Sequence, residues 1–154
     1  MERSSEQKAL GVFSVLALIF GILGIIFGVL VIAFGGIAMG NAGSIVSDAG
    51  VTTEQVGMFS GLFIGMGALL ILSGIFNLIN WRALKKVSHD ATQYKMAFVV
   101  TIISLVLAVL SLISAFLSAD GGQNIASGAF SVVWNLLILF LVVRVKNSVH
   151  QLNR

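Results

Sequence analysis

The chain has 154 residues, of which 58% are hydrophobic and only 10% are charged, and its net charge is +3. An ordinary soluble domain carries roughly 25% charged residues, so this composition excludes a water-soluble globular fold. The absence of cysteine excludes disulfides, thiolate metal ligands and a thiol nucleophile. We attribute the surplus of positive charge to contact with anionic lipid and expect no nucleic-acid partner.

Four long apolar segments follow one another along the chain, and none contains Asp, Glu, Lys, Arg or His. They cover about residues 10–40, 56–80, 96–118 and 125–143. Each reaches the roughly 20 residues that a membrane-spanning helix needs. We therefore predict an all-α integral membrane protein in which residues 1–154 form a single domain of four transmembrane helices. The first segment is much longer than the apolar region of a cleavable signal peptide, so we expect it to be retained.

The basic residues predict how these segments cross the membrane. All nine Lys and Arg residues lie before the first segment, between the second and third, or after the fourth, and none lies in the two other gaps. By the positive-inside rule, both termini are cytoplasmic. The glycine-rich composition without cysteine resembles that of small four-span proteins of bacteria, so we expect a bacterial plasma membrane. The basic residues expected to bind lipid headgroups are Arg82, Lys85, Lys86, Arg144 and Lys146.

The gaps carry helix-start and turn signals. Thr52 and Gln55, in a first outer loop of residues 41–55, have the spacing of a capping box, as do Asp90 and Gln93 in the inner gap. The second outer gap is so short that the third and fourth segments are predicted to form an antiparallel pair.

Small residues recur at steps of three and four in the first and third segments, which keeps them on one helix face. The second segment carries two such sets on different faces: glycines spaced by four, and a seven-step set of Ser60, Gly67 and Gly74. Small side chains allow helix backbones to approach closely in lipid, so we predict a bundle packed through small residues. The two faces leave open whether the glycine ladder packs inside one bundle or against another subunit. The predicted helix-packing residues are Gly21, Gly24, Gly28, Gly35, Gly57, Gly61, Gly65, Ser104, Ala108 and Ser111.

Uncharged polar residues lie on one face of the fourth segment and at the inner end of the second. They are Ser73, Asn77, Asn80, Asn124, Ser127, Ser131 and Asn135. Such groups need hydrogen-bond partners in hydrocarbon. They are interpreted first as interhelical hydrogen-bonding groups. A hydrated cavity or pore lined by them is the second interpretation, and a specific ligand site is the third.

The sequence carries no recognisable catalytic set. No ionisable residue lies inside an apolar segment, although proton-coupled carriers and voltage sensors require such residues. The histidines, His89 and His150, lie in the basic gaps and are interpreted as interfacial, with a metal or general-base role for His89 beside Asp90 as the alternative. No catalytic triad, phosphate loop or zinc spacing is present. We expect no enzymatic activity, no metal and no cofactor.

These observations favour a non-enzymatic small integral membrane protein that acts through helix-mediated assembly. It would form a homo-oligomer or serve as an accessory subunit of a membrane complex. The expected partners are membrane lipids and either itself or another membrane protein. The alternative is a small oligomeric channel or facilitator lined by the Ser and Asn residues of the second and fourth segments.

Overall fold

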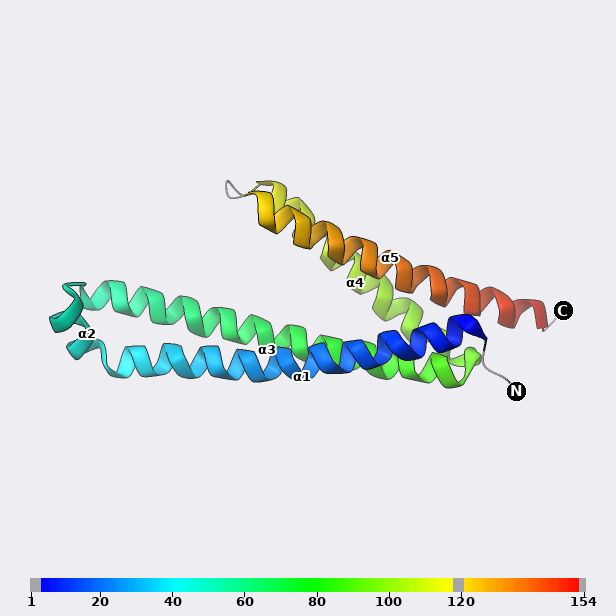
Figure 1. Ribbon diagram of the computed structural model, residues 1–154, viewed down its shortest axis with the longest axis horizontal. Helices are drawn as coiled ribbons and strands as arrows, with labels where there is room; N and C mark the ends of the chain where they lie inside the picture. The colour runs from blue at the N-terminus through cyan, green and yellow to red at the C-terminus, as the bar shows by residue number, and fades with distance from the viewer. Residues whose placement is uncertain (1–3, 118–120, 153–154) are drawn as a thin grey trace. The chain divides into compact units, whose positions relative to one another are not determined.

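The computed structural model describes residues 4–117 and 121–152, with side chains for all of these except residues 47–49, 117, 121–124 and 152. The described residues are helical almost throughout (Figure 1). In chain order the elements are α1 (Ser5–Gly40), α2 (Ala42–Ala49), α3 (Thr53–His89), the short 3₁₀ helix η1 (Ala91–Gln93), α4 (Tyr94–Leu117) and α5 (Gly121–Leu152).

Within the described ranges, four helices are long and apolar enough to cross a membrane, which confirms the prediction of an all-α chain with four candidate membrane spans. The helices run past the apolar segments, because the charged residues after Asn80 and after Val143 continue α3 and α5. The expected first outer loop is also not a simple loop. It contains α2, which is followed by the C-cap residue Gly50 with a φ of 64°. Glycine tolerates this left-handed conformation because it has no Cβ.

The chain forms two compact units. One takes the residues up to Ala17 together with those from Ile79 onward, and we call it the terminal unit. The other, Leu18–Leu78, contains most of α1, all of α2 and most of α3, and we call it the hairpin unit. Each is described by itself below, and the single domain stays a prediction.

In the hairpin unit, α1 and α3 run side by side in opposite directions (Figure 1). The residues in contact recur every seventh position on both helices, and seven residues complete about two helical turns, so the contact stays on one face. The facing pairs, each within 3.0 Å of a Cβ position, are Gly35 with Ser60, Gly28 with Gly67, and Gly21 with Gly74.

The two backbones touch directly along this face. A Cβ atom on Gly28 would lie 2.7 Å from the carbonyl oxygen of Gly67, and one on Gly74 would lie 2.7 Å from the carbonyl oxygen of Gly21. Real Cβ atoms essentially never approach other heavy atoms this closely. The hairpin therefore requires the hydrogen side chain of glycine at these positions. In lipid, where water provides no drive for helices to associate, such close approach increases the dispersion attraction between them.

The terminal unit packs differently, through larger side chains. It brings together the beginning of α1, the end of α3, η1, α4 and α5. Its fully buried side chains include Leu10 of α1, Leu84 of α3 and Val142 of α5. Helices α4 and α5 pack against each other, and a Cβ on Gly128 of α5 would lie 3.1 Å from the Cα of Leu112. The predicted pairing of the third and fourth segments is confirmed.

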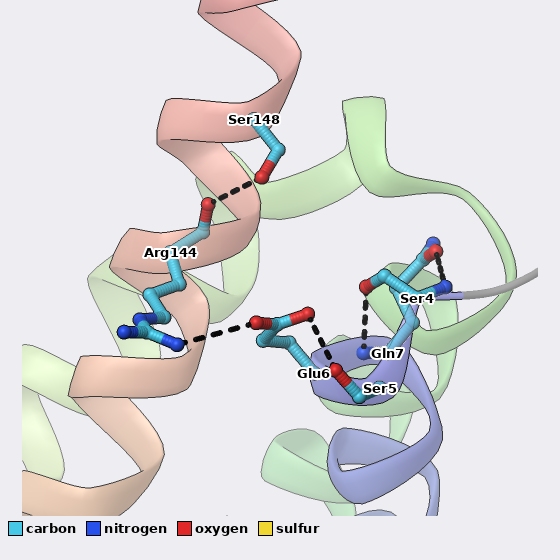
Figure 2. Close-up of polar contacts among 6 residues, drawn as sticks. All are labelled: Ser4, Ser5, Glu6, Gln7, Arg144 and Ser148. Atoms are coloured by element: carbon cyan, nitrogen blue, oxygen red, sulfur yellow. Dashed lines mark hydrogen bonds and ion pairs between the residues drawn. The ribbon is translucent and has the colours of Figure 1, made fainter.

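Two capping boxes begin the long helices α1 and α3. The Thr52 amide donates to Oε1 of Gln55 (2.9 Å) and the Gln55 amide donates to Oγ1 of Thr52 (3.2 Å), which confirms that prediction. Ser4 and Gln7 form the same reciprocal pair at 3.1 and 3.3 Å (Figure 2). The sequence analysis missed this second box, although its spacing is identical. Each box satisfies two backbone N–H groups that have no partner within the helix.

The alanine variant Gly28→Ala is expected to unfold more easily, with the free energy of unfolding lowered by about 1–3 kcal/mol, because the added methyl group forces α1 and α3 apart. The matched control is Gly36→Ala on the same helix, where no atom lies within 4 Å of the Cβ position. Thermal unfolding of both variants in one detergent, followed by circular dichroism, measures the difference. Equal melting temperatures would show that the hairpin does not depend on glycine at position 28.

Candidate functional sites

The glycines of α3 fall on two faces with opposite surroundings. A Cβ on Gly67 or Gly74 would meet α1 at less than 3.0 Å, whereas no described atom lies within 4 Å of the Cβ positions of Gly57, Gly61 and Gly65. We call this second set the open glycine face. Of the predicted packing residues, those on α1 lie against α3, whereas a Cβ on any residue of the open glycine face would meet no atom of the hairpin unit within 4 Å.

The predicted packing residues of α4 also divide. Ser104 and Ala108 are buried in the terminal unit, together with Thr101 and Ala115 on the same side of the helix. Ser111 is exposed, so it does not share the buried face of its neighbours.

Several of the predicted cavity-lining residues hydrogen-bond to their own helix. In the hairpin unit, Nδ2 of Asn77 donates to the carbonyl oxygen of Ser73 (3.1 Å). In the terminal unit, Nδ2 of Asn135 donates to the carbonyl oxygen of Ser131 (2.8 Å), whose hydroxyl donates to the carbonyl oxygen of Ser127 (3.0 Å). Each acceptor lies one helical turn before its donor. These bonds give the polar groups partners without water.

The predicted cavity-lining residues are divided between the two units. Ser73 and Asn77 lie in the hairpin unit, and Asn80 and Asn135 lie in the terminal unit. Asn124 was also predicted to be cavity-lining, and its side chain lies outside the described residues.

Asn80, another member of this predicted set, bonds to a different helix. Nδ2 of Asn80 on α3 donates to Oγ of Ser104 on α4 (3.3 Å), and this hydroxyl donates to the carbonyl oxygen of Val100 (2.9 Å). Asn80 Oδ1 and the hydroxyl of Thr101 are buried without a hydrogen-bond partner. Interhelical bonds of this kind contribute only about 0.6 kcal/mol on average in membranes. The interaction therefore fixes how α3 meets α4 more than it stabilises the fold.

An ion pair and a ring pair join α1 to α5 in the terminal unit. Nη1 of Arg144 lies 3.5 Å from Oε1 of Glu6 (Figure 2). Both side chains of the ion pair reach solvent, so we expect it to contribute little to stability. Nearer the middle of both helices, the rings of Phe13 and Trp134 meet edge to face at 4.8 Å between centroids.

The predicted headgroup-binding residues all lie in the terminal unit. Arg82 and Lys86 are exposed. The ammonium group of Lys85 lies 5.3 Å from the ring centroid of Trp81, and that of Lys146 lies 5.2 Å from the ring centroid of Phe98. Arg144, which pairs with Glu6, also lies over the ring of Phe140.

Asp90 caps η1 rather than joining a metal site or the predicted box with Gln93. Its carboxylate accepts hydrogen bonds from the Thr92 hydroxyl (2.7 Å) and the Thr92 amide (2.9 Å), and the Gln93 amide donates to the carbonyl oxygen of Asp90 instead. The side-chain hydrogen bond from Thr92 is the main cause that lowers the pKa of Asp90 below its ordinary value. His89 Nδ1 lies 3.0 Å from the carbonyl oxygen of Lys85. The prediction of a capping box at Asp90 was wrong, because the shorter span to Thr92 satisfies the carboxylate.

No family model matches the chain, and neither the curated proteins nor the solved structures contain a match to it.

Cysteine substituted for Asn135 or Ser131 is expected to react slowly with a water-soluble maleimide in the folded protein. Both residues lie inside the apolar part of α5, and their hydrogen bonds to the helix leave no need for water. The chain has no native cysteine, so the measurement has no background. Lys86→Cys, at an exposed position, serves as the reactive control. Rapid labelling at both test positions would instead indicate a hydrated path.

Proposed function

We propose that this chain is a non-enzymatic multi-pass membrane protein that acts through helix-mediated assembly. Its contact with another chain is the open glycine face of α3, and the first candidate partner is a second copy, which would make the protein a homo-oligomer. If the partner is instead a different membrane protein, the same close helix packing would make this chain an accessory subunit.

The open glycine face is the observation that carries this proposal. Glycine costs roughly 1 kcal/mol in a helix relative to alanine, and the hairpin contact explains that cost at Gly67 and Gly74. Nothing within the described chain explains it at Gly57, Gly61 and Gly65. Spacing by four residues is the pattern through which membrane helices approach each other most closely. A helix from another chain would use the space that these residues leave.

The membrane orientation belongs to the same proposal. The basic residues flank the ends of the helices in the terminal unit, whereas the connection through α2 carries no Lys or Arg. The positive-inside rule then places both termini in the cytoplasm and α2 outside. A bacterial plasma membrane is the location that the composition suggests.

The channel alternative has weaker support. The amide groups of Asn77 and Asn135 bond to their own helices rather than pointing donors toward a shared path. A hollow in the hairpin unit, with a volume of about 270 Å³, is lined by Val31, Phe34, Ala38 and Phe63. These side chains are apolar, so the hollow suits hydrocarbon rather than ions or water.

The assembly proposal predicts that Gly61→Leu reduces the mass of the purified protein in mild detergent to that of a monomer. The hairpin should remain intact, since no described atom lies within 4 Å of the Cβ position of Gly61. Mass measurement by light scattering or native mass spectrometry tests this. The matched control is Phe59→Leu, at an exposed position on nearly the opposite side of the helix.

Oxidative crosslinking distinguishes the possible partners. Gly61→Cys should form a disulfide-linked dimer if a second copy covers the face, because a disulfide needs Cα atoms roughly 4.4–6.8 Å apart. Phe59→Cys should not. A wild-type oligomer whose mass is unaffected by Gly61→Leu would contradict the proposed interface, and a monomeric wild type would contradict self-assembly.

The topology proposal predicts opposite labelling of two exposed positions. Glu54→Cys, in the first turn of α3, should react with a membrane-impermeant maleimide added to intact cells, because the proposed topology puts the start of α3 outside. Lys86→Cys should react only after the membrane is permeabilised. The reverse pattern would show that the termini face outward.

A further inference from the structure

Two side-chain pairs form a short ladder across α4 and α5 in the terminal unit. The rings of Tyr94 on α4 and His150 on α5 lie 6.2 Å apart between centroids. One turn after Tyr94 on α4 lies Phe98, and one turn before His150 on α5 lies Lys146. The ammonium group of Lys146 lies 5.2 Å from the ring centroid of Phe98. Residues four apart share a helix face. The four side chains therefore line one edge of the α4–α5 pair, which we call the ladder edge.

The ladder edge offers three kinds of hydrogen-bond donor: the phenol of Tyr94, the imidazole of His150 and the ammonium group of Lys146. Its aromatic contact holds the lysine over Phe98, since a cation is attracted to the face of a ring. The side chains of Tyr94 and Lys146 are partly buried, and His150 is exposed. The edge is thus open to a ligand and still ordered by its own contacts.

The described residues of the terminal unit carry a surplus of positive charge. The described cations of the terminal unit are Lys8, Arg82, Lys85, Lys86, Lys95, Arg144 and Lys146, and its described carboxylates are Glu6 and Asp90. Glu6 pairs with Arg144, and the carboxylate of Asp90 accepts a hydrogen bond from the Thr92 hydroxyl. Among the described residues, Lys146 therefore has no carboxylate within ion-pair distance. A negatively charged ligand would therefore be favoured over a positively charged one at this edge.

The depth of the ladder edge suits the headgroup of a lipid. Tyr94 begins α4 directly before its apolar part, and Lys146 lies a few residues beyond the apolar part of α5. Tyrosine and lysine at such positions lie at the membrane–water interface. The phosphate groups of phospholipids lie in this same layer.

We propose that the ladder edge binds the phosphate of an anionic phospholipid headgroup. Lys146 supplies the opposite charge, and Tyr94 and His150 donate hydrogen bonds to the phosphate oxygens. A zwitterionic lipid fits less well, because its own ammonium group would enter a region that already has surplus positive charge. This inference rests on the membrane placement proposed above and not on assembly through α3.

The test uses the full-length protein in mild detergent, with phosphatidylglycerol or phosphatidylcholine added in increasing amounts and bound lipid counted by native mass spectrometry. Wild type is expected to retain phosphatidylglycerol in preference to phosphatidylcholine. Lys146→Gln should weaken phosphatidylglycerol binding roughly fivefold, the effect of one basic residue near an anionic surface. Tyr94→Phe should weaken it by a smaller factor, and Lys146→Arg should retain it.

The matched control is Lys8→Gln, which removes the same charge at an exposed position on α1 and should change binding less than twofold. Equal losses in both glutamine variants would show a diffuse charge effect and overturn the site, as would equal binding of the two lipids. Displacement of the lipid by millimolar inorganic phosphate would show that the edge selects free phosphate rather than a membrane lipid. Circular dichroism of each variant establishes that it is folded, and the arginine variant separates loss of charge from loss of packing.

Discussion

Direct contact between the backbones of α1 and α3 is the constraint on which the hairpin depends. In water, helices associate because apolar surface leaves the solvent, but lipid tails are as apolar as leucine and remove that drive. The remaining attraction falls steeply with distance, so helices must come close to benefit from it. Glycine at every seventh residue allows this along a continuous face. The absence of proline keeps α1 and α3 free of the residue most likely to kink them.

The terminal unit shows a second way of joining helices. There, Leu10, Leu84 and Val142 fill the space between four helix segments, and polar contacts such as Asn80 to Ser104 set the register. Hydrogen bonds and an ion pair are concentrated near the charged ends of the helices. Helices α1 and α3 thus contact each other through glycine in the hairpin unit and pack through larger side chains in the terminal unit.

The apolar segments and the capping box at Thr52 could be predicted because both are local properties of the sequence. The separation of the two glycine faces of α3 followed from the helical repeat alone. Sequence could not say which of them would meet α1, because this depends on the register between two helices that are far apart in the chain. The pairing of Glu6 with Arg144 was missed for the same reason. Helix α2 was missed because a short polar segment between apolar runs is typical of a loop.

The candidate sites were less predictable than the fold. Polar residues inside apolar segments indicate that hydrogen bonds must form, but not where the partners lie. For Asn77 and Asn135, the partner shown is the preceding turn of the same helix, which a pattern of spacing cannot distinguish from a partner on a neighbour. Asn80, in contrast, reaches across to Ser104 on α4. The ladder edge was absent from the sequence analysis because its members come from two helices that the pattern alone does not align.

The length of α1 has a consequence for the bilayer itself. Its apolar part, residues 10–40, corresponds to about 46 Å of helix at 1.5 Å per residue, whereas a typical hydrocarbon core is roughly 30 Å thick. Such a mismatch is relieved by tilting the helix or by thickening the surrounding lipid, each at an energetic cost that grows with the excess length. A thicker bilayer reduces that cost. The energy of inserting this chain therefore depends on membrane thickness, and lipids with longer acyl chains should gather around it.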